Sequence, residues 1–535
     1  MSYLEDPSLT KISNYQNLVK EFMKRIQRAR YETFIINLAS AYEGYRFYLP
    51  AFLDFRGRIY RSGALHFHER DLARSLIVFS DTPYDNFQLD SDEKKDNVYM
   101  VLSSAAAFHY KKFISYDDAH QWYLDHKSVI NSSDESLIQL AVSASDPYQF
   151  ISKVLCIEGG KTDPRRIPIT QDASASAYQL MSFFLLDKEI AKHTNLIPAS
   201  YVYDQKINDI YTFFLEEIQV YLHNKMTENL LKVICPRKLI KVLFMPLIYG
   251  KTVSAMSDDI FNHFSTIVET EFSQLLGRGE STIVAFHMNK FFQDRFPGIV
   301  NLMELIRNVG WLSSALSKPV FYSIPLYTTV QDYMKTKAAK ILLYDRIHKK
   351  RRQVSLRIPT EDRDQRKTRS ATFANFIHQK DAQIAMLMIF NMITIGAPVY
   401  TVHDNFITTA PYAMRIPNLY IYNIKENDPL LIINNYLIRN LLDGRASLHS
   451  LDKPLPLDFL KSILEDKIPK NLNNTKKLIW EKKINSIYDA YVYYITTTFN
   501  YNTETGICNN FEKWNDFVSS MTDWDKFNYN YSLHL

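Results

Sequence analysis

The stretch TVHDNFITTA, residues 401–410, places the polar tripeptide His403-Asp404-Asn405 between two short runs rich in β-branched residues. Such residues favour strands and the tripeptide suits a turn, so the stretch predicts a β-hairpin with an acidic tip. Taken alone, a turn of this kind is more often structural than catalytic. A chemical role for Asp404 therefore depends on what the rest of the chain brings to the hairpin.

The composition of the 535 residues fits a globular protein, with 46% hydrophobic and 23% charged residues. A chain of this length forms about two to four domains or one large multi-lobed enzyme. The net charge of +5 is too small to identify a polyanionic partner by itself. The 35 Tyr and 33 Phe residues, set against 13 Gly, indicate an A/T-biased genome of the kind found in organelles and their plasmids.

Cysteine use and the N-terminal segment bear on the compartment. The three cysteines are far apart in the sequence: Cys156, Cys235 and Cys508. They form no disulfide framework, which fits a reducing compartment. The first sixteen residues carry acids and no apolar core, so they predict neither a signal nor a transit peptide. The longest apolar run, 384–399, is too short and interrupted for a membrane span.

Hydrophobic periodicity predicts a helix-rich α/β (α+β) fold. The segment IPITQDASASAYQLMSFFL (167–185) indicates a strand that runs into a helix. The other elements expected are helices at 15–45, 94–160, 205–310, 334–350 and 370–392, and strands at 318–333. From residue 411 the pattern is mixed, and the Asn- and Lys-rich stretch 466–483 predicts a surface loop.

A dense basic segment occupies residues 346–369, beginning with the run His348-Lys349-Lys350-Arg351-Arg352. Segments of this kind are usually solvated loops, and they are also what a phosphate-binding groove is made of. The sequence leaves both interpretations open.

A second acidic residue, Asp172, follows the strand-like run 167–170 and precedes a series of small residues. If Asp172 and Asp404 meet in space, they can hold a pair of divalent ions about 3.5–4 Å apart. Mg²⁺ suits such a pair, because it takes a few carboxylates and completes its shell with water and phosphate oxygens. The sequence alone does not show that the two residues meet.

The segment RKLIKVLFMPLIYG (237–250) spaces four chemically distinct side chains by four residues: Arg237, Lys241, Met245 and Tyr249. On a helix these side chains share one face. Its basic end could hold a triphosphate and its Tyr end could stack on a base. From the spacing alone, an ordinary amphipathic helix with a solvated basic end and a packed Met and Tyr is the favoured interpretation. Pro246 is expected to kink the helix.

Together these segments resemble the motifs of the single-subunit RNA polymerases of bacteriophages and mitochondria, over roughly residues 25–410. The motifs occur in the family's order: Asp54-Phe-Arg56-Gly57-Arg58-Ile-Tyr60, Asp172 with Ser174 and Ser176, the segment 237–250, Asn375-Phe-Ile-His378, and His403-Asp404. Gln331-Asp332-Tyr333 is a weaker match. Any one motif is a weak signal, whereas five in order are a strong one.

The resemblance implies a right-hand polymerase fold with palm and fingers, a truncated thumb and no N-terminal promoter domain. The expected divisions are 1–45 as a helical remnant of the thumb, 46–205 as the first part of the palm, 206–372 as the fingers, and 373–535 as the second part of the palm with a C-terminal extension. Truncation is expected because family members carry several hundred residues ahead of the motif that begins at Asp54.

The resemblance also implies catalysis of nucleotidyl transfer with two Mg²⁺ ions. Asp172, the backbone carbonyl of Ala173 and Asp404 would hold the metal ions. Lys241 and Arg237 would grip the triphosphate, with Lys241 a candidate to protonate the departing pyrophosphate.

Sugar and base recognition are implied for a second group of residues. Tyr249 and His378 would favour ribonucleotides through the 2′-hydroxyl, and Tyr211 would line the nucleotide site. Val242 stands where many relatives carry a second basic residue, so the grip on the triphosphate is expected to be weaker. Arg58 and Tyr60 would line the RNA–DNA hybrid, and His403 would support the priming end near Asp404.

The function implied is DNA-directed RNA synthesis, with DNA template, RNA product and ribonucleoside triphosphates as partners, no membrane, and an accessory factor that the sequence does not identify. The expected location is the mitochondrial matrix, with the gene on the organelle genome or a plasmid. Two alternatives stay open: an inactive nucleic-acid-binding remnant, and a family A-like DNA polymerase. His378 and the DxRGRxY segment argue against the DNA polymerase.

Overall fold

Four antiparallel strands form the largest sheet, in the order β10-β3-β9-β8. Their bounds are β3 Pro168–Ala173, β8 Tyr400–Val402, β9 Asn405–Thr409 and β10 Leu533–His534. The apolar and hydroxyl side chains from Phe406 to Thr409 are buried, which fixes the register of β9 against β3. The sheet therefore unites three segments that are far apart in the chain.

The computed structural model describes residues 12–80, 91–160, 162–199, 205–223, 236–266, 277–442, 452–506, 508 and 510–535. Cys235 and the first eleven residues, on which part of the compartment argument depends, lie outside these ranges.

Helices account for most of the described chain, so the predicted helix-rich α/β class is confirmed. The longer helices are α1 Ile12–Tyr42, α3 Asp92–Tyr110, α4 Tyr116–Ile130, α6 Pro147–Glu158, α7 Ser176–Leu185, α9 Ile210–His223, α11 Arg237–Leu247, α12 Val253–Thr266, α13 Arg278–Arg295, α14 Pro297–Ala315, α15 Gln365–Thr394, α17 Ile416–Lys425, α18 Pro429–Leu441, α19 Leu457–Asp466, α20 Asn474–Phe499 and α21 Asn510–Thr522. The shorter ones are α2 Asp71–Ser75, α5 Asp134–Ala141, α8 Lys188–His193 and α16 Ala410–Ala413, with 3₁₀ turns at Pro164–Arg166 and Asp523–Lys526.

One large apolar core joins most of these helices. It includes side chains of α7, α11, α14, α15, α18 and α20, together with β10. α15 runs through this core and touches α14, α7 and α17. Because α15 carries His378 and ends shortly before β8, its packing sets the position of both later motifs relative to the sheet.

Two further hairpins lie beside the sheet and the helices: β1 Ala51–Leu53 with β2 Ile59–Arg61, and β4 Val320–Ile324 with β5 Tyr327–Gln331. The second hairpin confirms the strands predicted at 318–333. Tyr322 of β4 is buried and its hydroxyl donates to Gln331 at 2.6 Å, which ties the two strands together.

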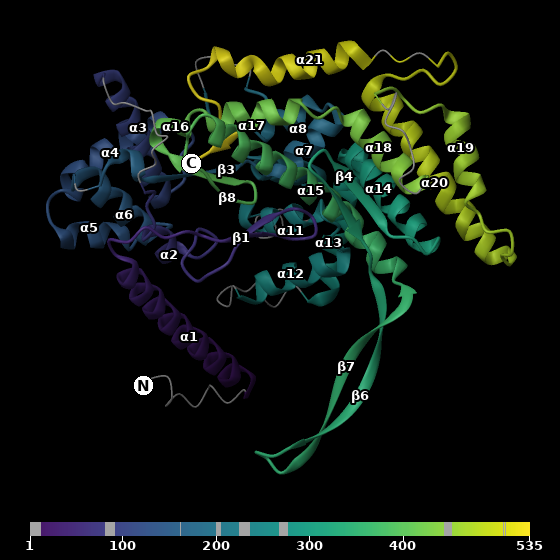
Figure 1. Ribbon diagram of the computed structural model, residues 1–535, viewed down its shortest axis with the longest axis horizontal. Helices are drawn as coiled ribbons and strands as arrows, with labels where there is room; N and C mark the ends of the chain where they lie inside the picture. Colours follow the sequence, from purple (N-terminus) through teal and green to yellow (C-terminus); the bar gives the residue numbers. More distant parts are fainter. Residues whose placement is uncertain are drawn as a thin grey trace.

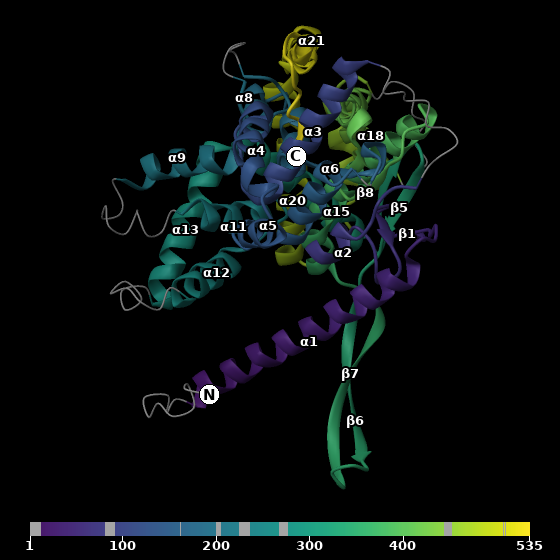
Figure 2. The same ribbon diagram turned by 90° about the vertical axis from the view of Figure 1, so that its left-hand side faces the viewer.

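The helix expected at 334–350 is wrong. Residues Met334–Asp345 form strand β6, which pairs with β7, Lys350–Arg363, in a long hairpin. Figures 1 and 2 show this hairpin, together with α1, projecting away from the body of the molecule. The basic segment 346–369 is therefore the hairpin tip, the strand β7 and the start of α15, and not a loop.

Two other expectations need correction. α11 ends at Leu247, one residue after Pro246, so Tyr249 lies in the turn that follows and not on the helix. The Tyr249 amide donates to the Pro246 carbonyl at 3.1 Å within that turn. The loop expected at 466–483 is short, because α20 begins at Asn474.

Among the described residues, none of the helices combines the length and the apolar character that crossing a bilayer requires.

Candidate active site

Two carboxylates from neighbouring strands form the floor of the candidate site. Asp172 stands opposite Asn405 in the pairing of β3 with β9. The Ala173 amide donates to the backbone carbonyl of Asp404 at 3.3 Å. The hairpin tip is turned by His403, which has a φ of 61°. The register of the sheet therefore brings Asp172 and Asp404 together.

The two carboxylates repel each other. Crowding by protein atoms and then the charge of Asp404 raise the pKa of Asp172 to about 7, against the opposing charges of Lys241 and Arg74. The Asp172 side chain is nevertheless open to solvent on one side. A cation at this accessible surface would remove the repulsion.

A third carboxylate, Asp381 of α15, was not predicted from the sequence. It is buried, accepts a hydrogen bond from Arg58 Nη2 at 2.5 Å, and lies within electrostatic range of Asp404. Burial and the Asp404 charge raise the pKa of Asp381 to about 7, while Arg58 lowers it. The available signal was its place three residues after His378, which puts both side chains on one helix face.

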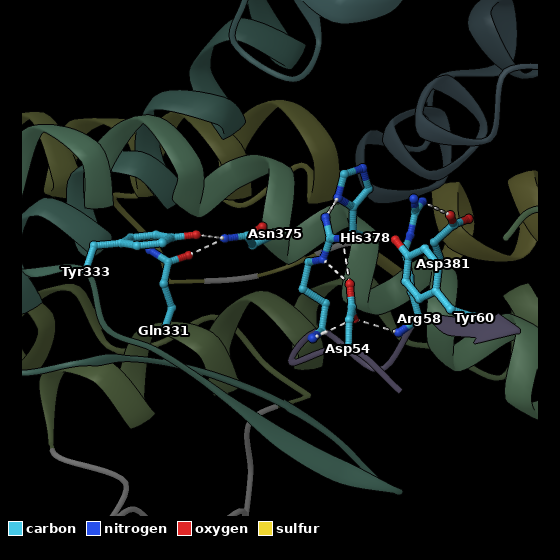
Figure 3. A network of polar contacts seen from close by, with 9 residues as sticks. Asp54, Arg58, Tyr60, Gln331, Tyr333, Asn375, His378 and Asp381 are labelled. Carbon is cyan, nitrogen blue, oxygen red and sulfur yellow. Dashed lines mark hydrogen bonds and ion pairs between the residues drawn. The ribbon is translucent and has the colours of Figure 1, made fainter. Parts of the chain in front are cut away.

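The DxRGRxY motif forms a tight turn around the carboxylate of Asp54 (Figure 3). Asp54 accepts from the amides of Arg56 and Arg58 at 2.9 and 3.0 Å, and from the Arg56 guanidinium at 2.6 and 2.8 Å. Gly57 has a φ of 84°, and a Cβ there would overlap the hydroxyl of Tyr327 on β5. The glycine of the motif is therefore required by its backbone conformation and by the approach of β5.

Arg56 links this turn to His378. Its Nη1 donates to His378 Nδ1 at 2.7 Å, and because a guanidinium only donates, the ring proton must be on Nε2. Burial and the charges of Arg58 and Arg56 lower the pKa of His378 to about 2, so the ring is neutral. Its centroid lies 5.0 Å from that of the Tyr249 ring. The ring of Tyr249 therefore lies next to the His378 ring, whose Nε2–H is a hydrogen-bond donor.

A second polar contact orders α15 one turn earlier. Asn375 Nδ2 donates to Gln331 Oε1 at 2.7 Å and to the Tyr333 hydroxyl at 3.2 Å (Figure 3). Gln331 and Tyr333, from the weaker match, therefore bind Asn375, the first residue of the motif that ends at His378. This contact anchors α15 to the end of β5.

The basic end of α11 differs from the expectation. Arg237 donates to Asp209 from Nε and Nη2 at 2.6 and 2.7 Å, so its charge is paired within the protein. Lys241, one turn further on, is exposed, and its Nζ lies 5.7 Å from the centre of the buried Tyr211 ring. Its charge lowers the pKa of Asp172. Lys241 is therefore close enough to Asp172 to act on its charge, whereas Arg237 shares its charge with Asp209.

Two further residues near this end were missed by sequence reasoning. Lys112 lies in the loop between α3 and α4. Desolvation and the charges of Arg237 and Lys241 lower its pKa, against the opposing charges of Asp209 and then Asp172. His534 of β10 pairs in register with Asp172. Neither residue belongs to a motif, and only the tertiary structure brings them to Asp172.

Aromatic rings surround the hairpin tip. The ring of His403 lies 4.9 Å from that of Tyr60 and 5.5 Å from that of His68, centroid to centroid. Burial and the charge of Arg58 lower the pKa of His403 to about 4, so it is neutral at pH 7. The Arg58 side chain is only 13% exposed, and its charge is paired with Asp381, so little of it faces solvent.

The donor set suits Mg²⁺ bound together with a substrate. In the part of the chain that the structure describes, His, Cys, Asp and Glu side chains form no cluster of three or more that could hold a metal ion unaided. The repulsion between Asp172 and Asp404, which Lys241 and Arg74 offset only in part, is what a divalent cation relieves. Mg²⁺ completes such a shell with water and phosphate oxygens.

Chemically, a carboxylate pair on a sheet faced by an exposed lysine and a Tyr–His pair is a candidate nucleotidyl-transfer site. The family model for DNA-dependent RNA polymerases matches residues 93–419. A probable DNA-directed RNA polymerase of Zea mays is 33% identical over 472 residues, which cover 81% of this chain and 42% of that protein. The chain therefore belongs to the family of single-subunit DNA-dependent RNA polymerases, and the resemblance seen in the sequence is confirmed.

Two further relatives are also named as DNA-directed RNA polymerases. A probable DNA-directed RNA polymerase of Agaricus bitorquis is 27% identical over 446 residues, which cover 77% of this chain and 39% of that protein. The mitochondrial DNA-directed RNA polymerase of Schizosaccharomyces pombe is 24% identical over 439 residues, which cover 76% and 36%. The chain thus spans less than half the length of these three relatives.

Proposed function

We propose that the chain carries the catalytic centre of a DNA-templated RNA polymerase that joins ribonucleoside triphosphates by two-metal nucleotidyl transfer. The observation that carries this proposal is the convergence of Asp172 and Asp404 on one accessible surface, next to Lys241. Family membership supplies the reaction class.

In this proposal Asp172 and Asp404 hold two Mg²⁺ ions. The Ala173 carbonyl, which also accepts from the Ala175 amide at 2.8 Å, keeps a lone pair for one of them. The ions, when bound, activate the attacking 3′-hydroxyl and stabilise the charge on the leaving pyrophosphate. Lys241 is the candidate to donate a proton to that pyrophosphate, because its ammonium is exposed and lies near Asp172.

The triphosphate grip is assigned first to Lys241, with Lys112 beside it. Arg237 is paired with Asp209. Its attraction for phosphate is therefore weaker than the sequence suggested. The buried Tyr211 ring lies beneath the ammonium of Lys241, with Nζ 5.7 Å from the ring centre.

Sugar and hybrid contacts follow from the rings around the hairpin tip. Tyr249 and the Nε2–H of His378 are the proposed sensors of the 2′-hydroxyl. Tyr60 is the proposed contact of the RNA–DNA hybrid, and His403, whose ring it touches, is the proposed neighbour of the priming end. For Arg58 the geometry favours a role in holding Asp381. Direct contact of Arg58 with the hybrid stays a prediction.

The proposed palm consists of residues 46–205 and 373–535, because β3 of the first segment pairs with β9 and β10 of the second. Residues 206–372 form the proposed fingers between them, and α1 belongs to the proposed thumb. One boundary needs adjustment, since α15 runs without a break from Gln365 to Thr394.

The β6–β7 hairpin is the proposed contact for template or downstream duplex DNA. Its strands are exposed almost throughout and carry basic side chains from Lys335 to Arg363. Neutralising phosphates releases counterions, so such a contact weakens steeply with salt.

We further infer a mitochondrial setting, since the fission-yeast relative is named as mitochondrial. A gene on an organelle plasmid agrees with the abundance of Tyr and Phe.

Primer extension tests the proposed function. The chain is given an RNA primer on a DNA template with ribonucleoside triphosphates and Mg²⁺. We expect extension that Asp172→Asn and Asp404→Asn each reduce by at least about a thousandfold, because each removes one of two metal-binding carboxylates. Asp163→Asn is the matched control, since Asp163 pairs with Arg165 ahead of β3.

Three results would contradict the proposal. Salt-sensitive binding of the primed template without any extension would favour the inactive remnant. A preference for deoxynucleotides would favour the DNA polymerase. Full activity of Asp404→Asn would remove the carboxylate pair from the mechanism.

A further inference from the structure

Arg307 of α14 is packed against the turn that carries Tyr249. Gly250, the next residue, has a φ of 96°, and a Cβ added to it would lie 2.6 Å from Arg307 Nη2. The same Cβ would lie 3.8 Å from the carbonyl oxygen of Ser370 on α15. Arg307 therefore contacts the backbone directly after Tyr249, close to α15.

Arg307 is also linked to α15, the helix that carries His378. Its guanidinium carbon lies 5.9 Å from the centre of the Phe373 ring. Its Nη1 donates to Glu304 at 3.3 Å, and Glu304 accepts from Arg369 Nη2 at 2.5 Å. Phe373 and Arg369 both belong to α15, so a shift of Arg307 acts on that helix through a ring contact and an ion-pair relay.

The C-terminal region braces the same relay. Arg369 Nε and Lys483 Nζ donate to one oxygen, Asn308 Oδ1, at 3.2 and 3.1 Å. Asn308 Nδ2 donates to Ser486 Oγ at 3.0 Å. Lys483 and Ser486 are on α20, so this helix helps fix α14 against α15.

Two donors of Arg307 are unsatisfied. The side chain is 15% exposed, and its Nε and Nη2 are buried without a hydrogen-bond partner among the described residues. A buried donor without an acceptor is destabilising.

We propose that Arg307 is a positioning residue for ribose selection: packed against both Gly250 and α15, it sets the spacing of Tyr249 and His378. It touches neither the nucleotide nor the metal-binding carboxylates and acts through Tyr249. This inference rests on the proposed function, because only a polymerase that distinguishes sugars needs that spacing.

The test uses the full 535-residue chain with Arg307→Met, which keeps length and packing but removes the donors, and Arg307→Lys, which keeps the charge. Arg295→Met is the matched control, since Arg295 donates to Glu189 and Glu217 at 2.8 Å each on the end of α13. Two ratios are measured: kcat/KM for ATP over dATP in primer extension, and the association constants of ATP over dATP with Mg²⁺ by calorimetry. The Tm of each variant reports on folding.

We expect Arg307→Met to lower both ratios by about tenfold, because a displaced Tyr249 weakens the one hydrogen bond to the 2′-hydroxyl on which discrimination depends. Arg307→Lys should fall between it and the wild type, and Arg295→Met should leave both ratios unchanged at a similar loss of Tm. Unchanged ratios in Arg307→Met overturn the inference while leaving the proposed function intact. If the wild-type chain binds nucleotides but extends nothing, the proposed function fails and the calorimetric ratio alone decides the role of Arg307. A wild type with no ribose preference in either assay overturns the inference.

Discussion

The four-stranded sheet and the β6–β7 hairpin are both antiparallel, yet their side chains meet opposite surroundings. Most side chains of β3 and β9 are buried. The pairing of the two strands and the helices packed on the sheet fix the positions of the carboxylates near the strand ends. In β6 and β7 nearly every residue is exposed, and the pairing runs far beyond the body of the protein (Figure 2). Positions in the sheet are fixed by packing, whereas those in the hairpin are free to meet a partner.

This contrast separates two kinds of residue. A charge on the sheet or on α15 interacts with neighbours inside the protein, so changing it alters stability and the site together. A charge on the hairpin has mainly water around it, so changing it should alter only the binding of an external polyanion. Four variants, the last of them a double substitution, test the contrast in decreasing order of effect on stability.

Arg58→Ala should have the largest effect, because it leaves the buried carboxylate of Asp381 unpaired. We expect a loss of about 3–5 kcal/mol at pH 8. Without Arg58 the pKa of Asp381 rises further above its unfolded value, so the folded state binds the extra proton and the loss becomes smaller as pH falls. Urea unfolding at pH 8 and pH 5 measures this difference. An equal loss at both pH values would show that the ion pair is not what stabilises this region.

Gly57→Ala should cost about 2–3 kcal/mol, because its φ is positive and Tyr327 occupies the space of the new Cβ. Gly63→Ala is the matched control: its φ of 113° is also positive, but nothing lies within 4 Å. Comparing the two free energies of unfolding isolates the steric part. Similar values for both would mean that β5 yields to the methyl group.

Asp172→Asn should stabilise the metal-free chain at neutral pH. The pKa of Asp172 is about 7 in the folded protein, above its value in the unfolded chain, so ionisation of this group destabilises folding as pH rises from about 4 to 7. We expect a gain on the order of 1 kcal/mol at pH 7.5, limited by solvent screening, and none at pH 4. Thermal unfolding without divalent ions measures it. A gain that persists at pH 4 would point to packing and not to charge repulsion.

Arg351→Ala with Arg357→Ala on the hairpin should change stability by less than about 0.5 kcal/mol, because both side chains are exposed. Each should lower the slope of log affinity for duplex DNA against log salt by about 1, if each meets one phosphate. Lys477→Ala on α20, which removes a surface charge elsewhere, is the control. An unchanged slope in the double variant would argue against DNA contact by this face.

Much of the site was predictable because its chemistry is local to short motifs. The strand that carries Asp172 near its end and the hairpin at Asp404 each form where their residues indicate. The helix expected at 334–350 failed because Ala, Leu and Lys favour helices in isolation, while pairing with β7 supplies the backbone hydrogen bonds of a strand instead. Pro246 ended α11 early, because proline donates no amide hydrogen bond and the chain turns after it.

The sequence by itself determined the family, the order of the motifs and the identity of the two floor carboxylates. Only the tertiary structure decided that Arg237 is paired with Asp209, that Asp381 and Lys112 join the site, and that Arg307 reaches Gly250. A motif shows which residues a single segment requires for its own backbone geometry and chemistry. Charge pairing and burial depend on which distant segments pack together, and no local pattern encodes those neighbours.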